Sequence, residues 1–255
     1  MFKLLKYALY DILKSRFALI YTLFLALVAV SIYQVSDDLS KVSLSLMNIM
    51  VLFIPLIAAV FATTHFYNNL EFIELMLAQP VKRFHVFMSQ LLAVVLMLSL
   101  SLIIGFGLPM LIWGADSSLI TLLSVGVTLS VVFAGFAFLA SVLTRDKAKA
   151  VGVSLALWIY FSLVYDGLVL YVIYSFADYP LEKATLAMVL FNPVDLGRIL
   201  MLMQLDISAL MGYTGAFFQQ FFSSGSGILI AGMALVIWML IPNFLATRVF
   251  KRRDF

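Results

Sequence analysis

Six long apolar runs, separated by short polar segments, dominate the pattern of this sequence. They cover residues 17–35, 44–64, 86–113, 119–143, 150–176 and 228–246. Each is near or above the roughly 20 residues that a helix needs to cross a hydrocarbon core. Helices leave no backbone group unpaired in lipid, and the runs are too long and too uniformly apolar for barrel strands. The pattern predicts an all-α integral membrane protein with six transmembrane helices in a single domain, residues 1–255.

The composition agrees with this prediction. Hydrophobic residues make up 64% of the chain and charged residues only 11%, which is too little polar surface for a protein surrounded by water. The chain has no cysteine. Disulfides, thiolate catalysis and cysteine-ligated metal centres are therefore excluded.

Basic residues are distributed very unevenly between the two sides that six spans would create. Thirteen of the sixteen lie at the termini or in connections on the same side, and the three on the other side are Lys41, Lys183 and Arg198. This bias predicts a multi-pass membrane protein with both termini in the cytoplasm. A seventh span through residues 184–204 would bury Asp195 and Arg198 and move the basic C-terminus outside, so six spans are favoured.

Residues 1–16 combine lysines and apolar residues at a helical period. Lys3, Lys6 and Lys14 share one face with Tyr10. This favours an amphipathic interfacial helix on the cytoplasmic surface, with its lysines directed toward lipid phosphates. A frayed basic tail is the alternative.

The segment at residues 68–80 is the most polar stretch between two of the predicted spans on the cytoplasmic side. At 100° per residue, one helical face is apolar and the other carries Glu71 and Glu74. The apolar face consists of Leu70, Phe72, Ile73, Met76 and Leu77. Gln79 followed by Pro80 ends the helix, because a residue before proline is disfavoured in the α region. The helix either docks into a soluble partner or lies in the lipid interface. Its acidic face favours a protein partner, since acidic side chains gain nothing from an anionic leaflet.

The run from Glu74 to Arg83, ELMLAQPVKR, resembles the coupling segment of type-2 ABC export permeases. In that family six-helix subunits pair, and each pair sits on two ATPase subunits. The resemblance implies a homodimer that binds no cofactor itself, with ATP and Mg²⁺ on a cytoplasmic ABC ATPase dimer. The residues expected to couple to the ATPase are Glu71, Glu74, Leu75, Leu77, Gln79, Pro80, Arg83, Arg145, Asp146 and Lys147.

Motifs in the second half of the chain narrow the resemblance. They are GFGLP at 105–109, RDKAKAVG at 145–152, YDGLVL at 165–170, ADYPLEK at 177–183, NPVDLGRI at 192–199 and QLDISALMGYTGA at 204–216. They are similar to the permeases of Nos-type ABC systems, which mature the copper-sulfide site of nitrous oxide reductase. The resemblance runs from about residue 65 to the end, whereas the first sixty residues match in hydropathy only. It implies a NosF-like ATPase, a periplasmic NosD-like solenoid protein and, through that protein, a copper chaperone or the reductase.

The segment at residues 177–227 is extracytoplasmic in the predicted topology, and it is long, apolar and divided into short helices. It forms either a binding surface or a shield over the outer ends of the spans. The resemblance implies that the solenoid protein binds here. The candidate residues are Asp195, Arg198, Asp206, Tyr213, Phe217 and Phe218. Asp195 and Arg198 also stand three residues apart, so they are able to pair on one helical face.

Motifs for chemistry are absent from the sequence. There is no Gly-x-x-x-x-Gly-Lys-Ser/Thr loop, so energy must come from a partner, and neither His-Glu-x-x-His nor Gly-x-Ser-x-Gly occurs. We therefore expect a non-enzymatic subunit with no metal site. Copper binding by the thioethers of Met201 and Met203 is the weak alternative, because methionine is also an ordinary filler of apolar helices.

Asp166 is the one carboxylate inside a predicted span. A charge in that position must face a partner or water, so Asp166 and its neighbour Tyr165 belong either to a transport pathway or to a packing contact. Ala148, Gly152 and Ala156 follow a four-residue spacing that allows another helix to approach closely, within or between subunits.

Three classes of function remain. A type-2 ABC permease is favoured, either for nitrous oxide reductase maturation or for another substrate such as a lipid, drug or ion. An ion-coupled secondary transporter would need several midplane ionisable residues and often an internal repeat, and an intramembrane enzyme would need paired catalytic groups. Besides the proteins above, only membrane lipids are expected as partners, with no nucleic acid. If the permease serves nitrous oxide reductase maturation, the expected cargo is a sulfur species, or the motion of the permease itself acts on the external partner.

Overall fold

The computed structural model describes residues 2–36, 38–114, 117–177, 179, 181–204 and 225–253. Within these ranges the chain is helical and no strand occurs. The helices are α1 (Phe2–Leu13), α2 (Arg16–Val35), α3 (Leu39–Asn68), α4 (Leu70–Leu77), α5 (Arg83–Trp113), α6 (Ser117–Leu143), α7 (Lys147–Ile159), the π-helical turn η1 (Tyr160–Val164), α8 (Tyr165–Ser175), α9 (Glu182–Leu190), α10 (Pro193–Gln204) and α12 (Gly225–Arg252).

Six helices of the described chain are long and apolar enough to cross a membrane, as the sequence predicts. They are Arg16–Val35, Leu39–Asn68, Arg83–Trp113, Ser118–Leu143, Lys147–Ser175 and Leu229–Arg252. All six are longer than the apolar runs, because polar residues continue the helices beyond the hydrocarbon region. The fifth span joins α7, η1 and α8 into one helix that contains a π-helical turn. No local sequence signal predicted that turn.

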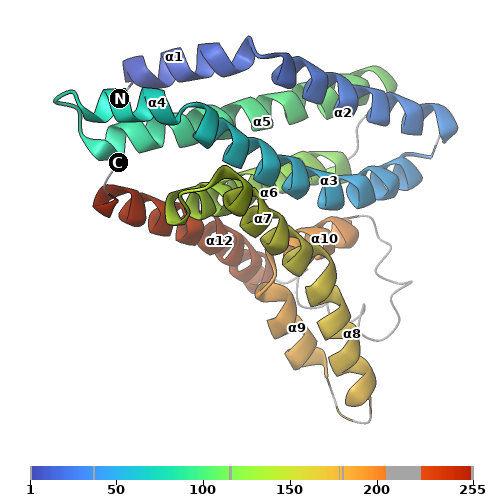
Figure 1. The fold of residues 1–255 in the computed structure, drawn as a ribbon. Coiled ribbons are helices and arrows are strands. Elements are labelled where there is room, and N and C mark those ends of the chain that lie inside the picture. Colours follow the sequence, from blue (N-terminus) through green and yellow to red (C-terminus); the bar gives the residue numbers. More distant parts are fainter. Residues whose placement is uncertain are drawn as a thin grey trace.

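The bundle is organised around α6, which packs against α3, α5, α7, α10 and α12. A second layer is formed by α1 and α2, which both pack along α5 (Figure 1). Both termini lie beside α4 at one end of the bundle, which we call the α4 end (Figure 1). The predicted position of α1 in the lipid interface stays a prediction, and α1 has Ile12 buried in the protein core.

Close helix contacts depend on glycines at two positions. A Cβ on Gly105 of α5 would stand 2.6 Å from the Leu25 Cβ of α2, and a Cβ on Gly197 of α10 would stand 2.6 Å from the Val125 Cγ1 of α6. Both distances are far inside van der Waals contact, so only glycine allows these helix backbones to approach so closely.

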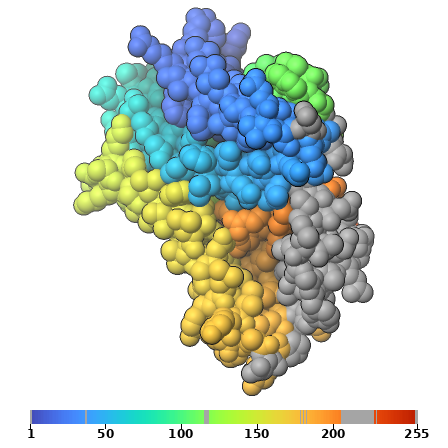
Figure 2. All heavy atoms as spheres, turned by 90° about the vertical axis from the view of Figure 1, so that its right-hand side faces the viewer, coloured from blue at the N-terminus to red at the C-terminus, as the bar shows by residue number. Residues whose placement is uncertain are grey.

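A sharp reversal places α10 within the bundle. The helices Lys183–Leu190 and Pro193–Gln204 are bent by 115° relative to each other. Asn192 begins the second helix: its Oδ1 accepts a hydrogen bond of 2.9 Å from the Val194 N–H, and Pro193 occupies the first helical position. Figure 2, which faces the end opposite α4, shows the orange atoms of α10 between those of α3 and α8.

Candidate functional site

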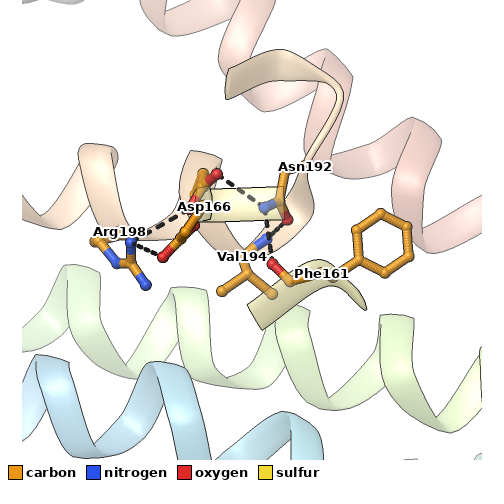
Figure 3. A network of polar contacts seen from close by, with 6 residues as sticks. Phe161, Asp166, Asn192, Val194 and Arg198 are labelled. Carbon is orange, nitrogen blue, oxygen red and sulfur yellow. Dashed lines mark hydrogen bonds and ion pairs between the residues drawn. The ribbon is translucent and has the colours of Figure 1, made fainter. Parts of the chain in front are cut away.

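Three charged residues from two helices form one cluster (Figure 3), beside the half of the fifth span that is remote from the α4 end (Figure 1). Arg198 Nη1 of α10 donates to Asp166 Oδ2 of α8 at 2.9 Å and to Asp195 Oδ1 at 3.4 Å. The side chains of Arg198 and Asp166 are about one-third exposed, whereas that of Asp195 is only 10% exposed. The cluster is therefore a partly buried network that ties α10 to the fifth span.

Asn192 connects this cluster to the π-helical turn. In η1 the Tyr165 N–H donates to the Tyr160 carbonyl, five residues back. The Phe161 carbonyl instead accepts a hydrogen bond of 2.8 Å from Asn192 Nδ2, which also donates to Asp195 Oδ2 at 2.8 Å (Figure 3). Asn192 is completely buried. Such single π turns are frequent at functional sites, and here the irregular turn provides an acceptor that fixes the start of α10.

Burial controls the protonation of Asp195, which lies outside the six spans. It raises the pKa of the Asp195 carboxyl to about 7, and hydrogen bonding to Asp166 and the charge of Asp166 act in the same direction. The charge of Arg198 and the hydrogen bond from Asn192 oppose this shift in pKa. The network therefore contains a carboxyl group that exchanges its proton near neutral pH.

The Asp166–Arg198 pair separates two cavities. One, of about 320 Å³, lies between α8, α9 and α10, and its walls include Val169, Ile173 and Leu202. The other, of about 230 Å³, lies between α3 and η1. Asp166 and Arg198 line both of them. A rearrangement of this ion pair would change the connection between the two cavities beside the fifth span.

The structure changes the interpretation of several predicted residues at this end. Asp195 was expected on a surface for an external partner, but it is 7% exposed and faces Arg198 and Asn192. The expected pairing of Asp195 with Arg198 occurs, yet the closer contact of Arg198 is with Asp166. Tyr165 has a packing contact: its hydroxyl donates to the Met188 carbonyl of α9 at 2.7 Å.

The remaining predictions for the outer segment concern two methionines and four residues that the structure does not describe. Met201 is 1% exposed in the main core, and Met203 packs beside a smaller apolar cluster, so packing accounts for both. Within the described ranges, no group of three His, Cys, Asp or Glu side chains could hold a metal ion. Asp206, Tyr213, Phe217 and Phe218 lie outside the described residues.

At the α4 end, the short helix α4 follows α3 after a single residue, Asn69. It is shorter than the predicted range of 68–80, because α3 continues through Asn68 and the helix ends before Gln79 and Pro80. Ile73 is 1% exposed, and Leu70, Met76 and Leu77 pack against the core.

The outer face of α4 is not purely acidic. Phe72, which belongs to the predicted apolar face, has a side chain that is 42% exposed, and Leu75 is 61% exposed. Both lie on the outside together with Glu71 and Glu74. Two carboxylates beside two large apolar groups make a surface typical of a protein interface rather than of an anionic lipid surface.

Two arginines join the helix ends near α4. Arg83, predicted to contact the ATPase, donates from Nη1 to the carbonyls of Lys251 at 3.3 Å and Arg253 at 2.7 Å. Arg253 in turn donates to the carbonyls of Ser141 and Val142 at the end of α6, both at 2.8 Å. These contacts form a clamp from α5 through α12 to α6, and they satisfy helix C-terminal carbonyls that have no intrahelical partner.

Comparison with known proteins shows the family to which this six-span chain belongs. The family model described as ABC-2 family transporter protein matches residues 3–255. The chain belongs to the ABC-2 transporter family. The match begins at residue 3, so the resemblance is not limited to the part beyond residue 65 that the motifs indicated. A relative from Stutzerimonas stutzeri, "Probable ABC transporter permease protein NosY", is 28% identical over 281 aligned residues, which cover 95% of each chain.

Membership in the ABC-2 family makes this chain a multi-pass inner-membrane permease subunit, homologous to NosY. It also implies an ATPase partner and pairing of membrane subunits. In this ABC-2 permease the fifth span is the least covered: 11% of its most apolar window is buried, against 61% for the fourth span. The predicted small-residue positions Ala148, Gly152 and Ala156 are all exposed on it, so the described part of the chain leaves room for another helix there.

The connection before the fifth span contains the other residues that the sequence assigned to ATPase coupling. Arg145 is exposed and lines a shallow basic hollow with Arg252 and Arg253. Asp146 caps α7, accepting from the Lys149 N–H at 2.9 Å, and Lys147 Nζ donates to Asn68 Oδ1 at 2.9 Å. Lys147 thus links the fifth span to the end of α3, immediately before α4.

Sequence reasoning assigned no functional role to four residues in these two regions: Asn192, Arg253, and Asn48 and Ser162, which line the 230 Å³ cavity. Ser162 carries no local functional pattern, and Asn192 was noted only as part of the motif NPVDLGRI. Sequence reasoning assigned Arg198 to an outer surface, although the need of Asp166 for a positive partner was a signal for the observed ion pair. An intramembrane carboxylate needs a partner. The predicted outer segment, residues 177–227, contains two cations, Lys183 and Arg198, that are candidates to pair with Asp166.

Proposed function

We propose that this permease works as a homodimer on a cytoplasmic ATPase dimer and serves the assembly of the copper-sulfide site of nitrous oxide reductase. It either passes a small sulfur species outward or moves an external solenoid partner. The similarity to NosY across 95% of both chains supports the choice of system. The chain itself binds no nucleotide in this proposal, and ATP and Mg²⁺ belong to the partner.

The observation that carries this proposal is the construction of α4. Its inner residues, such as Ile73, are buried in the bundle, and its outer face presents Glu71, Phe72, Glu74 and Leu75. Only Asn69 separates it from α3. A force applied to this face is therefore transmitted directly to the second span, and through the packing of α3 on α6 and α7 to the rest of the bundle.

Pairing through the fifth span completes the proposed transporter. The exposed stripe of Ala148, Gly152 and Ala156 permits close backbone approach of a second copy. In that arrangement the Asp166–Arg198 cluster of each subunit lies in the outer half of the helix nearest the dimer axis. Motion of α4 then reaches the two cavities beside this cluster through the second and fifth spans.

The experiment is ATPase stimulation after co-expression with the cognate ATPase. Glu74→Ala combined with Leu75→Ala should abolish copurification of the ATPase or reduce stimulated hydrolysis more than tenfold, and maturation of the reductase should fail. Leu111→Ala is the matched control, because Leu111 is an 82% exposed leucine on α5 near its far end. Normal stimulation and maturation in the double variant would refute the docking assignment.

A further inference from the structure

Ser162 is a buried hydroxyl without a partner among the described residues. It is 4% exposed, and its Oγ forms no hydrogen bond with any residue that the structure describes. Several other span hydroxyls bond the carbonyl four residues back, as Ser130 does to Gly126 at 2.8 Å and Ser154 to Ala150 at 2.9 Å. Ser162 lies within η1, where that ladder is shifted. A buried unsatisfied hydroxyl costs about 1–3 kcal/mol, so a solute that hydrogen-bonds it would offset this cost.

Ser162 lines the 230 Å³ cavity between α3 and η1. The facing wall is formed by Asn48, Val51 and Leu52 of α3. Pro55 has no N–H, so the Val51 carbonyl lacks the helical donor four residues further on. Asn48 is exposed at the mouth, ten residues into α3, a position at which an amide side chain requires water or a polar partner.

Arg198 and Asp166 close the inner side of this cavity. Both hydrogen bonds that Arg198 makes to the described residues use Nη1, which leaves Nη2 and Nε as donors. The cavity thus offers donors from Ser162, Asn48 and Arg198, and an acceptor from Asp166. Its remaining walls, which include Leu163, are apolar, as is usual for small-molecule sites.

The balance of charge restricts the occupant. The single guanidinium is already opposed by Asp166 and, when ionised, by Asp195. A dianion would be repelled by these carboxylates, and a metal cation would meet Arg198 at close range. A solute that accepts from Arg198 and Ser162 while donating to Asp166 satisfies these three groups.

We infer that this cavity binds a small, protonated hydrogen-bonding solute with at most one negative charge, of which hydrosulfide is the simplest member. The inference rests on the proposed function, because it names the class of cargo that the permease would handle beside its fifth span. The Asp166–Arg198 pair then forms the floor of the site and separates it from the cavity next to α9 and α10.

Binding to the full chain in lipid nanodiscs tests the inference. Sodium hydrosulfide, sodium sulfate and sodium chloride are titrated at equal ionic strength and slightly below neutral pH, where Asp195 holds its proton and does not repel an anion. The readout is the fluorescence of Trp158, whose Nε1 donates to the Leu52 carbonyl at the cavity wall at 3.1 Å. Trp113→Phe and Trp238→Phe remove the other two indoles of the chain, so all binding variants are made in that background. The chain has no cysteine, so hydrosulfide cannot act on a thiol or disulfide of the protein.

Ser162→Ala is the decisive variant. It should weaken hydrosulfide binding about tenfold without lowering the thermal unfolding midpoint, because it removes an unsatisfied hydroxyl, and Asn48→Ala should also weaken binding. Ser31→Ala is the matched control, since its hydroxyl is engaged with the Leu27 carbonyl at 2.7 Å. Absence of saturable hydrosulfide binding, or unchanged affinity in Ser162→Ala, would overturn the site. Sulfate binding as tight as hydrosulfide binding would overturn the charge limit.

A second measurement uses the absence of native cysteines. Ser162→Cys provides the only thiol in the chain, and aqueous iodoacetamide should alkylate it in nanodiscs if solutes reach the cavity. An unreactive thiol in the folded protein would contradict the site. Both measurements use the permease without its ATPase, so this inference can fail while ATPase stimulation through α4 succeeds, and the reverse.

Discussion

Arg198 on α10 donates to Asp166 on α8 at 2.9 Å, although the two residues are 32 positions apart in the sequence. The contact joins a short helix after the fifth span back to that span. We predict that Arg198→Met lowers the free energy of unfolding by about 1–3 kcal/mol, because it leaves the carboxylates of Asp166 and Asp195 facing each other without a cation. Thermal unfolding in detergent measures the change.

Asp166→Asn should cost less than Arg198→Met, because the pair is about one-third exposed and Arg198 keeps Asp195 as a partner. The variant with both changes should be more stable than the sum of the single changes predicts, since it removes both charges of the pair together. Strict additivity would show that the two side chains do not interact.

The protonation of Asp195 predicts a pH dependence of stability. Its pKa is about 7 in the folded chain, whereas the ordinary pKa of an exposed aspartate is 3.8, so the native state holds a proton that the unfolded chain releases. The corresponding stability is complete below about pH 4 and is lost as the pH rises toward 7. The unfolding midpoint of the wild type should therefore fall from about pH 5 to about pH 7 relative to that of Asp195→Asn.

A second carboxyl variant separates the pH dependence due to Asp195 from that due to the other carboxyl groups of the chain. Asp38→Asn changes an exposed carboxylate near Lys41 and should keep the wild-type pH slope. Identical slopes for the wild type and Asp195→Asn would show that Asp195 is ionised throughout the range.

The close approach of α2 and α5 gives a prediction with a control in the same motif. Gly105→Ala should destabilise the protein by about 1–3 kcal/mol, because its Cβ would stand 2.6 Å from Leu25 Cβ and 3.1 Å from the Thr22 carbonyl oxygen. Gly107→Ala should be neutral or slightly stabilising, since its nearest neighbour is 3.9 Å away. Equal effects of the two variants on thermal unfolding would contradict the observed packing.

Local patterns predicted much of this fold. The six spans follow from hydropathy, and α4 follows from an apolar period that Ile73 and Leu77 obey. Phe72 lies 100° from Ile73 on the helical wheel, at the edge of the apolar face, so the period does not bury it fully. The described part of the bundle leaves its ring 42% exposed, and a protein partner would cover it.

The polar network could not be predicted in the same way. Its contacts depend on the 115° reversal between α9 and α10 and on a carbonyl freed by the π turn. Neither leaves a periodic signal in the sequence. The contact of Arg83 with the end of α12 spans 170 positions, and only the assembled bundle brings those segments together.

The clamp formed by Arg83 and Arg253 predicts a defect in coupling. Arg253 fastens the end of α12 to the last carbonyls of α6, while Arg83 fastens the start of α5 to the end of α12. Arg253→Met should therefore release α12 from α6 and reduce ATPase stimulation several-fold, with a loss of about 1–3 kcal/mol in stability. The neighbouring Arg252→Met is the matched control, because the side chain of Arg252 is exposed and takes no part in the clamp. If the two variants stimulate the ATPase equally, motion of α4 reaches the spans through α3 alone, and the clamp serves only to hold the helix ends together.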